Sequence, residues 1–237
     1  NVLNGTNSQT TITYDITPTS LEGCPGGNFL LTVLLNPVAQ LTTISDQICS
    51  ASTYSKTFVH VTDGIIPAGT TYNWSFTNNT NIQNESSSNI NSTYFTQTVN
   101  NITNATQTVT YSIPPITNSC SGPAVTLYLG VKPLPYVNTQ ITSICSGSSF
   151  SFTPANGGTD HNIVPSGITY TWTYQNNTSV SGQLNQSTPT GTISGTLNNL
   201  TITQQTQTYN VTPTANGCIG NVFNVLVDLV PNASITT

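Results

Sequence analysis

The sequence predicts an all-β protein, and three observations lead to this prediction. Hydrophobic residues make up 35% of the 237 residues and alternate with Thr, Ser and Asn at a period of two, which is the pattern of strands with one buried and one solvated face. Ala, Glu, Lys and Arg are scarce, whereas the strand formers Thr, Val, Ile and Tyr are common, so long helices are disfavoured. The third observation is an internal repeat of about 97 residues.

The repeat is defined by the segment Thr-Tyr-x-Ile/Val-x-Pro, which occurs three times. Each copy is followed by a cysteine and then by an alternating apolar strand. Proline-containing connectors close the copies and stiffen the links between them. We therefore divide the chain into a partial unit with the last strands only (1–43), a full unit (44–140) and a second full unit (141–237). The three repeated cysteines are Cys24, Cys120 and Cys218.

Each full unit is expected to contain about seven short strands separated by turns rich in Asn, Gly and Ser. Units of this length and strand spacing are typical of an immunoglobulin-like β-sandwich. The partial unit supplies only its last strands, around 12–18 and 29–35. The aromatic stripes at 72–76 and 170–174 are predicted to be core strands that carry Trp74 and Trp172, rather than a platform for sugar binding.

The cysteines predict one disulfide within each full unit. Cys49 and Cys145 are placed at the start of the first strand, and Cys120 and Cys218 in the turn before the last strand. Because these two places are expected to lie at the same end of a sandwich of this topology, the expected pairs are Cys49 with Cys120 and Cys145 with Cys218, each contributing about 4 kcal/mol by the loop-entropy argument. Cys24 remains odd, either unpaired or paired with an upstream half. The alternative is five reduced thiols; disulfides imply an oxidising compartment.

Composition and spacing argue against several classes of function. Charged residues make up 4% of the chain, with two basic residues in total, too few to neutralise the phosphates of a nucleic acid. No apolar stretch approaches the ~20 residues of a membrane-spanning helix. His60 and His161 lie in no catalytic spacing, and the acids are scattered singly. We therefore expect no catalytic residue, no metal or cofactor site and no enzyme activity.

Asn-x-Ser/Thr triplets make several asparagines candidate acceptors for glycans. Two of them recur at equivalent positions of the full units. In an Asn- and Thr-rich chain such triplets permit glycosylation without establishing it. The candidates are Asn101, Asn199, Asn73, Asn176 and Asn210.

Three blocks of the last unit resemble a known family. They read Ile-Cys-Ser-Gly (144–147), Pro-x-Gly-x-Thr-Tyr-x-Trp (165–172) and Thr-Tyr-x-Val-Thr-Pro-Thr-Ala-x-Gly-Cys (208–218). This pattern is similar to the PKD-like, immunoglobulin-like tandem repeats of giant cell-surface adhesins of gliding Bacteroidetes. The middle unit departs from it at Ala51 and Pro114. The resemblance implies an exported, cell-surface array or filament, secreted by the type IX route, with no catalytic residues.

The leading hypothesis is a structural repeat segment of a long extracellular adhesin or surface filament, acting as spacer or adhesive surface. Its expected partners are neighbouring repeats or like subunits in a fibre, with surface glycans as a further candidate. One alternative is a carbohydrate-binding module of a secreted enzyme, with Tyr94, Phe95 and Tyr136 as candidate contacts. Another is a filament subunit in which residues 1–43 complete a neighbour's sandwich by strand exchange.

Overall fold

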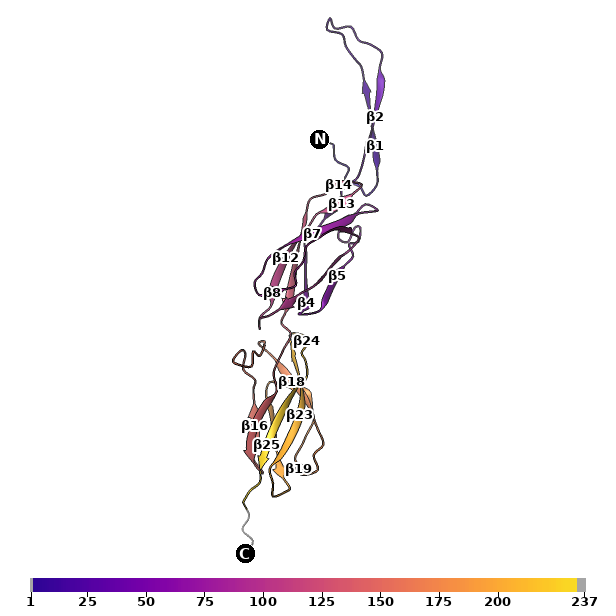
Figure 1. Cartoon of the computed structure of the whole chain (residues 1–237). Coiled ribbons are helices and arrows are strands. Elements are labelled where there is room, and N and C mark those ends of the chain that lie inside the picture. The colour runs from indigo at the N-terminus through magenta and orange to yellow at the C-terminus, as the bar shows by residue number, and fades with distance from the viewer. Residues whose placement is uncertain (1, 234–237) are drawn as a thin grey trace.

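The protein is all-β and immunoglobulin-like, as the sequence predicts. The computed structural model describes residues 2–233. Figure 1 shows a two-stranded ribbon and two sandwiches arranged end to end in one elongated molecule. The ribbon spans residues 4–37; the first and second modules are the sandwiches that follow, within 38–135 and 136–233.

The ribbon is formed by β1 (Thr10–Ile16) and β2 (Phe29–Leu35), which pair antiparallel along their whole length. The strands of the first module are β3 (Gln40–Leu41), β4 (Ile44–Cys49), β5 (Thr53–Lys56), β6 (Gly64–Ile65), β7 (Thr71–Thr77), β8 (Ile82–Gln83), β9 (Ser88–Ser92), β10 (Phe95–Thr98), β11 (Asn100–Asn101), β12 (Gln107–Ile113), β13 (Pro115–Thr117), β14 (Cys120–Ser121) and β15 (Val125–Lys132). The main sheet has the order β14-β13-β7-β12-β15-β4, with β9 also paired to β7. The opposite layer is built from the pair β5-β10 and the shorter pairs β8-β11 and β3-β6.

The second module repeats this arrangement almost strand for strand. Its strands are β16 (Gln140–Cys145), β17 (Ser149–Phe152), β18 (Thr169–Tyr174), β19 (Val180–Ser181), β20 (Gln186–Thr190), β21 (Ile193–Thr196), β22 (Asn198–Asn199), β23 (Gln205–Ala215), β24 (Cys218–Ile219) and β25 (Phe223–Val230). The main sheet has the order β16-β25-β23-β18-β20, with β24 paired to β23.

The first strand of each module runs parallel to the last strand. In the first module β4 pairs with β15, so that Ile44 lies opposite Leu127 and Cys49 opposite Lys132. In the second module Cys145 lies opposite Val230 in the same way. The cysteine therefore sits at the end of the first strand, not at its start as the sequence predicts, and at the C-terminal pole of its module.

Each module has its own aromatic core. Trp74 and Trp172 are buried, and each indole N–H donates to a backbone carbonyl at 3.1 Å, that of Ser86 and that of Leu184 respectively. This confirms the predicted core role of the two stripes. Phe95 is fully buried and packs on Trp74 with ring centroids 5.0 Å apart. The two cores share no residue, so each sandwich buries its own apolar face.

The ribbon shows the same strand pair without the rest of the sandwich. Its register aligns Tyr14 with Leu31, as Tyr111 aligns with Leu127 in the first module. Tyr111 and Leu127 are completely buried, whereas Tyr14 is 42% exposed and Leu31 is 45% exposed. The ribbon thus presents one half of a sandwich core that the described residues leave uncovered (Figure 1).

The buried tyrosines make the fold sensitive to alkaline pH. Burial raises the pKa of Tyr170 from 10.0 to about 12, and burial together with the neighbouring Tyr174 raises that of Tyr209 to about 12. Below pH 10 these phenols are neutral in the folded and the unfolded chain, so their packing is fully stabilising. Between pH 10 and about 12 only the unfolded chain ionises, which favours unfolding. We expect stability to fall over this range and tyrosinate absorbance to rise together with the loss of circular dichroism. Titration of all tyrosines near pH 10 in a folded protein would contradict this.

Two buried hydroxyls, Tyr54 Oη and Tyr170 Oη, have no partner within 3.5 Å among the described residues, although Asp46 lies near enough to Tyr54 to help burial raise the pKa of its phenol. The second module carries Phe150 at the position that corresponds to Tyr54, and Phe150 is also buried. An unpaired buried hydroxyl costs about 1–3 kcal/mol of desolvation. Tyr54→Phe is therefore expected to leave the first module as stable as before, or more stable by up to about 1 kcal/mol. Denaturant unfolding measures this. A loss of more than about 1 kcal/mol would reveal a partner for the hydroxyl.

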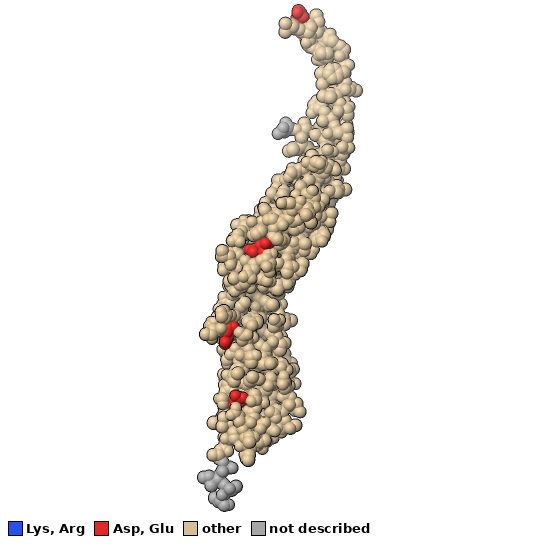
Figure 2. All heavy atoms as spheres, viewed as in Figure 1, with Lys and Arg blue, Asp and Glu red and all other residues tan. Residues whose placement is uncertain are grey.

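The surface carries very little charge. Figure 2 shows isolated acidic residues spread along the molecule on an otherwise uncharged face. Among residues 2–233 one ion pair forms, between Lys56 Nζ and Asp63 Oδ1 at 2.7 Å. Burial of Asp63 opposes its ionisation, but hydrogen bonds from Lys56 and from the amide of Val59 lower its pKa on balance. No helix that could cross a membrane occurs in the described part of the chain.

Candidate functional site at the module joint

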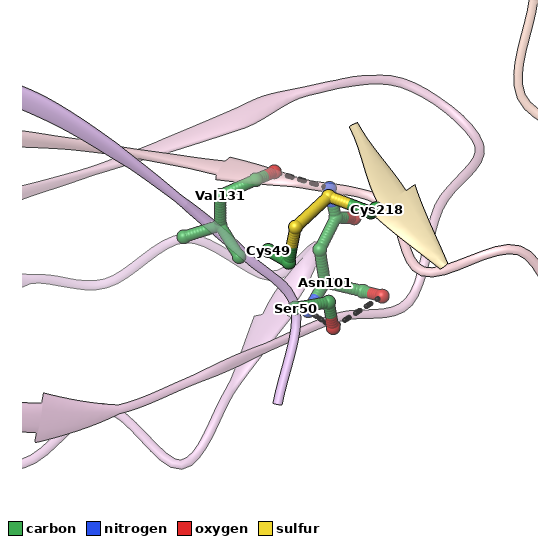
Figure 3. The surroundings of a disulfide bond; sticks show 5 residues. All are labelled: Cys49, Ser50, Asn101, Val131 and Cys218. Atoms are coloured by element: carbon green, nitrogen blue, oxygen red, sulfur yellow. Dashed lines mark hydrogen bonds between the residues drawn. A yellow bond between two sulfur atoms is a disulfide. The ribbon is translucent and has the colours of Figure 1, made fainter. Parts of the chain in front are cut away.

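A disulfide joins the two modules to each other. Cys49, at the end of β4, is bonded to Cys218, at the start of β24, with 5.7 Å between their Cα atoms (Figure 3). The two residues are 169 positions apart and belong to different modules. The predicted pairs within modules, Cys49 with Cys120 and Cys145 with Cys218, are therefore wrong. Cys24, Cys120 and Cys145 are free, and Cys24 and Cys145 are exposed.

The direction of the first strand explains the error. Because β4 runs parallel to β15, Cys49 lies beside the last residue of β15, whereas Cys120 precedes the first. The seven steps from Val125 to Lys132 span about 23 Å at ~3.3 Å per residue. Bonded cysteines have Cα atoms 4.4–6.8 Å apart as a rule of geometry. The early and late cysteines of one module consequently occupy opposite poles, and Cys49 meets its partner in the neighbouring module.

Backbone bonds fix the pole that carries Cys49. The amide of Ser50 donates to the carbonyl of Lys132 at 2.8 Å, and the amide of Ser52 donates to that of Cys49 at 3.1 Å. The Ser50 hydroxyl oxygen accepts a hydrogen bond from the amide of Asn101 at 2.9 Å. The Cys-Ser step thus has a defined role: the cysteine points to the joint while the serine anchors the strand end to β11 (Figure 3).

Asn101 is the central polar residue of this pole. Its Nδ2 donates to the carbonyls of Val131 and Ala105, both at 2.7 Å, and its Oδ1 accepts from the amide and the hydroxyl of Thr103 at 2.9 and 2.8 Å. Asn101 is 4% exposed. Its amide group is therefore fully engaged, with no free N–H for a glycan. The Asn-x-Thr triplet here is an internal hydrogen-bond motif.

The same motif occurs in all three units. In the second module Asn199 donates to the carbonyls of Leu229 and Thr203 and accepts from Thr201. In the ribbon Asn4 donates to the carbonyls of Leu35 and Ser8. The recurrence of Asn101 and Asn199 is thus explained by structure; glycosylation at these two positions stays a prediction, against which their engaged amide groups argue.

The remaining candidate acceptors lie elsewhere. Asn176 is exposed in the loop after β18, beside a shallow polar depression. Asn73 and Asn210 are half-buried on the main sheets, and their Oδ1 atoms accept hydrogen bonds from the amide of Asn91 and from the side chain of Gln175. Glycosylation at these three positions stays a prediction.

The other half of the bridge is a tight hairpin. Cys218 follows a turn in which Asn216 and Gly217 both adopt left-handed conformations, with φ of 53° and 81°. This is the backbone of a two-residue turn between paired strands, here β23 and β24, and it holds Cys218 against the first module with 1% of its surface exposed. In the first module Asn118 and Ser119 form the same kind of turn before Cys120, with φ of 47° and 65°.

A glycine two residues after the cysteine lets the connector pass. A Cβ placed on Gly220 would overlap the carbonyl oxygen of Pro135, and one on Gly122 would overlap that of Ala39. Both carbonyls belong to the connector that leads into the same module. The Cys-x-Gly step therefore has two roles: its cysteine is placed to form the disulfide, and its glycine leaves room for the connector.

Substitution of Gly220 is expected to loosen this seat. Gly220→Ala forces the connector at Pro135 to move, and we expect the second module to lose about 1–3 kcal/mol of its free energy of unfolding, the range typical of overpacking. Faster proteolysis at 133–139 should accompany the loss. Gly191→Ala is the matched control, because a Cβ there meets no atom within 4 Å. Equal behaviour of the two variants would contradict the proposed contact.

A loop of the second module completes the joint. The isolated bridge between Tyr136 and Ile163 joins the connector to the loop before β18. Within this loop Asn162 is buried, and its Oδ1 accepts from the amide of Asn138 at 2.9 Å. His161, exposed and with φ of 52°, lies across a shallow depression from Ile102 of the first module. It belongs to a turn at the joint.

The other residues singled out from the sequence are dispersed. Phe95 is buried and cannot contact a sugar, which corrects its place among the aromatic candidates, whereas Tyr94 and Tyr136 are 44% and 41% exposed in different parts of the molecule. The Nδ1 atom of His60 accepts from the amide of Ile66 at 3.1 Å. Within the described residues no group of three or more His, Cys, Asp or Glu side chains could hold a metal ion.

Comparison with known proteins gives one family match. The PKD-like domain matches residues 1–39, 44–135 and 141–233. No curated protein matches the chain. Among solved structures, the chain resembles mouse clustered PcdhgC3 EC1-3 with a TM-score of 0.32 and 11% identity, over 96% of this chain and 79% of that one.

Two further structures show similar values. The FN1-FN3 domains of chicken CNTN1 match with a TM-score of 0.37 and 9% identity, over 93% of this chain and 76% of that one. An endo-fucoidan hydrolase, MfFcnA4 from glycoside hydrolase family 107, matches with a TM-score of 0.31 and 11% identity. That match includes 94% of this chain but only 34% of the hydrolase.

Proposed function

Because the chain belongs to the PKD-like domain family, we propose that it is a stiff, extracellular spacer of tandem modules, forming part of a surface adhesin or filament. The observation that carries the proposal is the Cys49–Cys218 bond, which locks one module onto the next. A disulfide is typical of proteins outside the reducing cytoplasm. In a tandem array each unit adds length at nearly constant stability, and a covalent joint resists bending where unlinked domains would hinge.

Small-angle X-ray scattering of the oxidised and the reduced protein tests this function. The oxidised chain should scatter as one elongated particle with the end-to-end arrangement of Figure 1. Reduction, or the variant Cys49→Ser, should broaden the distribution of distances between the modules while leaving the circular dichroism of the sandwiches unchanged. Cys145→Ser is the matched control, since Cys145 is free. Identical scattering before and after reduction would remove the argument for a spacer stiffened by disulfides.

The ribbon supports a second proposal, that it belongs to a further module completed by strands outside residues 2–233. Its apolar face carries Phe29 and Leu31, 53% and 45% exposed, and an isolated two-stranded hairpin is marginally stable in water. The strands come either from the same polypeptide or from a second subunit by strand exchange. A denaturing gel of native material separates the two cases. A very large band indicates one long chain, whereas a band near 25.1 kDa from polymers that dissociate on boiling indicates exchange.

Sugar binding receives less support. Carbohydrate platforms need adjacent exposed aromatic faces, and the two tryptophans are core residues. Tyr94 and Tyr136 remain as single exposed rings without an aromatic neighbour among the ring pairs of the described residues. Loss of glycan-array binding in Tyr94→Ala would favour a carbohydrate-binding module over the spacer.

A further inference from the structure

We propose that the free cysteines at the two poles are half-sites for the same bond, so that Cys145 is covalently linked to the late cysteine of a further module of this family and Cys120 to the early cysteine of a preceding one. This inference rests on the proposed tandem array and specifies how its units are joined. The occupant of each pole is a repeat unit of the same kind. It is identified by the bond that the described chain already forms at its internal joint.

The first argument is that the pole of Cys145 reproduces the pole of Cys49 bond for bond. The amide of Ser146 donates to the carbonyl of Val230 at 2.9 Å, as that of Ser50 does to Lys132 at 2.8 Å. The amide of Ser148 donates to the carbonyl of Cys145 at 3.0 Å, and the Ser146 hydroxyl oxygen accepts from the amide of Asn199 at 2.9 Å. The backbone therefore presents the sulfur of Cys145 from the same position as that of Cys49.

The second argument is the surface around Cys145. At the internal joint Ile102, Thr103 and Asn104 of the first module line a depression together with the 156–163 loop of the second. Ile102 is 47% exposed at this joint, whereas its counterpart Leu200 in the second module is 62% exposed and the nearby Ile202 is 90% exposed. Two apolar side chains thus lie uncovered in the place that a following module occupies at the internal joint, next to an exposed thiol.

The third argument is the opposite half-site. The hairpin of Cys120 matches that of Cys218: Thr117 pairs with Cys120 across a left-handed turn, as Ala215 pairs with Cys218. Gly122 seats the connector at Ala39, as Gly220 does at Pro135. The ribbon precedes this hairpin in the row of units (Figure 1). Cys120 therefore faces the unit to which the ribbon belongs, where an early cysteine would meet it.

Formation of each bond is an ordinary thiol–disulfide exchange. One cysteine thiolate attacks a low-molecular-weight disulfide such as glutathione disulfide, which releases one reduced thiol and leaves a mixed disulfide. The thiolate of the facing cysteine then displaces the second glutathione thiol. Two protein thiols are oxidised, one disulfide oxidant is reduced to two thiols, and two protons pass from the protein thiols to the released thiolates.

The test extends the full chain by one unit. A second copy of residues 140–237 is joined directly after residue 237, which continues the repeat in register, and the protein is folded in glutathione redox buffer. Peptide mapping without reduction should find Cys49–Cys218 and a new bond between Cys145 and the Cys218 of the appended copy. The number of free thiols per chain should stay at three, as in the original chain.

Two variants serve as controls. Cys218→Ser in the appended copy alone should leave Cys145 free, and Cys145→Ser in the original part should leave the appended Cys218 free. Neither should affect Cys49–Cys218. Two additional free thiols in the unmutated extended chain, or a bond between the two cysteines of the appended copy, would overturn the proposal.

Scattering separates this outcome from failure of the proposed function. If the extended chain is a longer rod but Cys145 stays free, the spacer stands and the repeated bond is refuted. If the extended chain is not elongated by one further unit, the spacer itself fails. Tryptophan fluorescence of each variant establishes that its modules are folded, so an absent bond cannot be attributed to an unfolded copy.

Discussion

Pulled from its two ends, the oxidised chain is expected to extend by about 590 Å less than the reduced chain. Force enters at the N-terminus, reaches Cys49, crosses the disulfide to Cys218 and leaves by the C-terminus. The 169 positions between the two cysteines carry no load, and at ~3.5 Å per extended residue they account for the difference. All buried core residues of the first module lie within this shielded stretch, whereas those of the second module include four on β25, which lies outside it.

Single-molecule force spectroscopy measures this directly. The oxidised protein should show only short events, in which β4 and β25 are pulled from their sheets, and addition of reductant should release the full length of both sandwiches. Cys218→Ser should behave as the reduced protein does, and Cys145→Ser as the oxidised one. Two full-length unfolding events in oxidised protein would contradict a bond between Cys49 and Cys218.

Removal of the Asn101 side chain is expected to have the second largest effect. Asn101→Ala deletes two donor and two acceptor bonds at a site 4% exposed, and the carbonyl of Val131 loses this partner. Because buried polar groups without partners cost about 1–3 kcal/mol each, we expect the first module to lose about 3 kcal/mol of unfolding free energy. In the second module the equivalent hydrogen bonds are made by Asn199, so that module should keep its stability.

The two modules can be followed separately because each contains one tryptophan. Denaturant unfolding of Asn101→Ala in a Trp172→Phe background reports on Trp74 and hence on the first module. Asn89→Ala is the matched control, since Asn89 is exposed on β9. A loss below about 0.5 kcal/mol, the range of ordinary surface substitutions, would contradict the structural role of Asn101.

The sequence contains enough to predict the β-fold, the aromatic cores and the repeat, because these depend on local alternation and on composition. Trp74 belongs to a series of aromatic residues at every second position, which lie on one face of a strand and favour its burial. The disulfide partner of Cys49 depends instead on the direction in which β4 pairs with β15. A strand paired antiparallel at that edge would have placed Cys49 near Cys120, and no local pattern around residues 44–49 decides between the two directions.

The structural role of the repeated asparagine could have been recognised from its spacing in the sequence. Asn4, Asn101 and Asn199 each precede a threonine by two residues and lie about 31 residues before the end of the last strand of their unit. An acceptor for glycans has no reason to keep that distance, whereas a side chain that bonds the last strand does. The Cys-x-Gly step is a similar signal, present at Cys24, Cys120 and Cys218. Its role could not be predicted from the sequence, because the connector that contacts the glycine reaches it only in the folded protein.

The scarcity of charge on the surface (Figure 2) has a consequence for the environment in which the protein works. Dissolved ions weaken attractions between exposed charges that are separated by more than a Debye length, and a molecule held together by apolar cores, amide ladders and a sulfur–sulfur bond contains few such attractions. Its shape and cohesion should be nearly the same in fresh water and in brine.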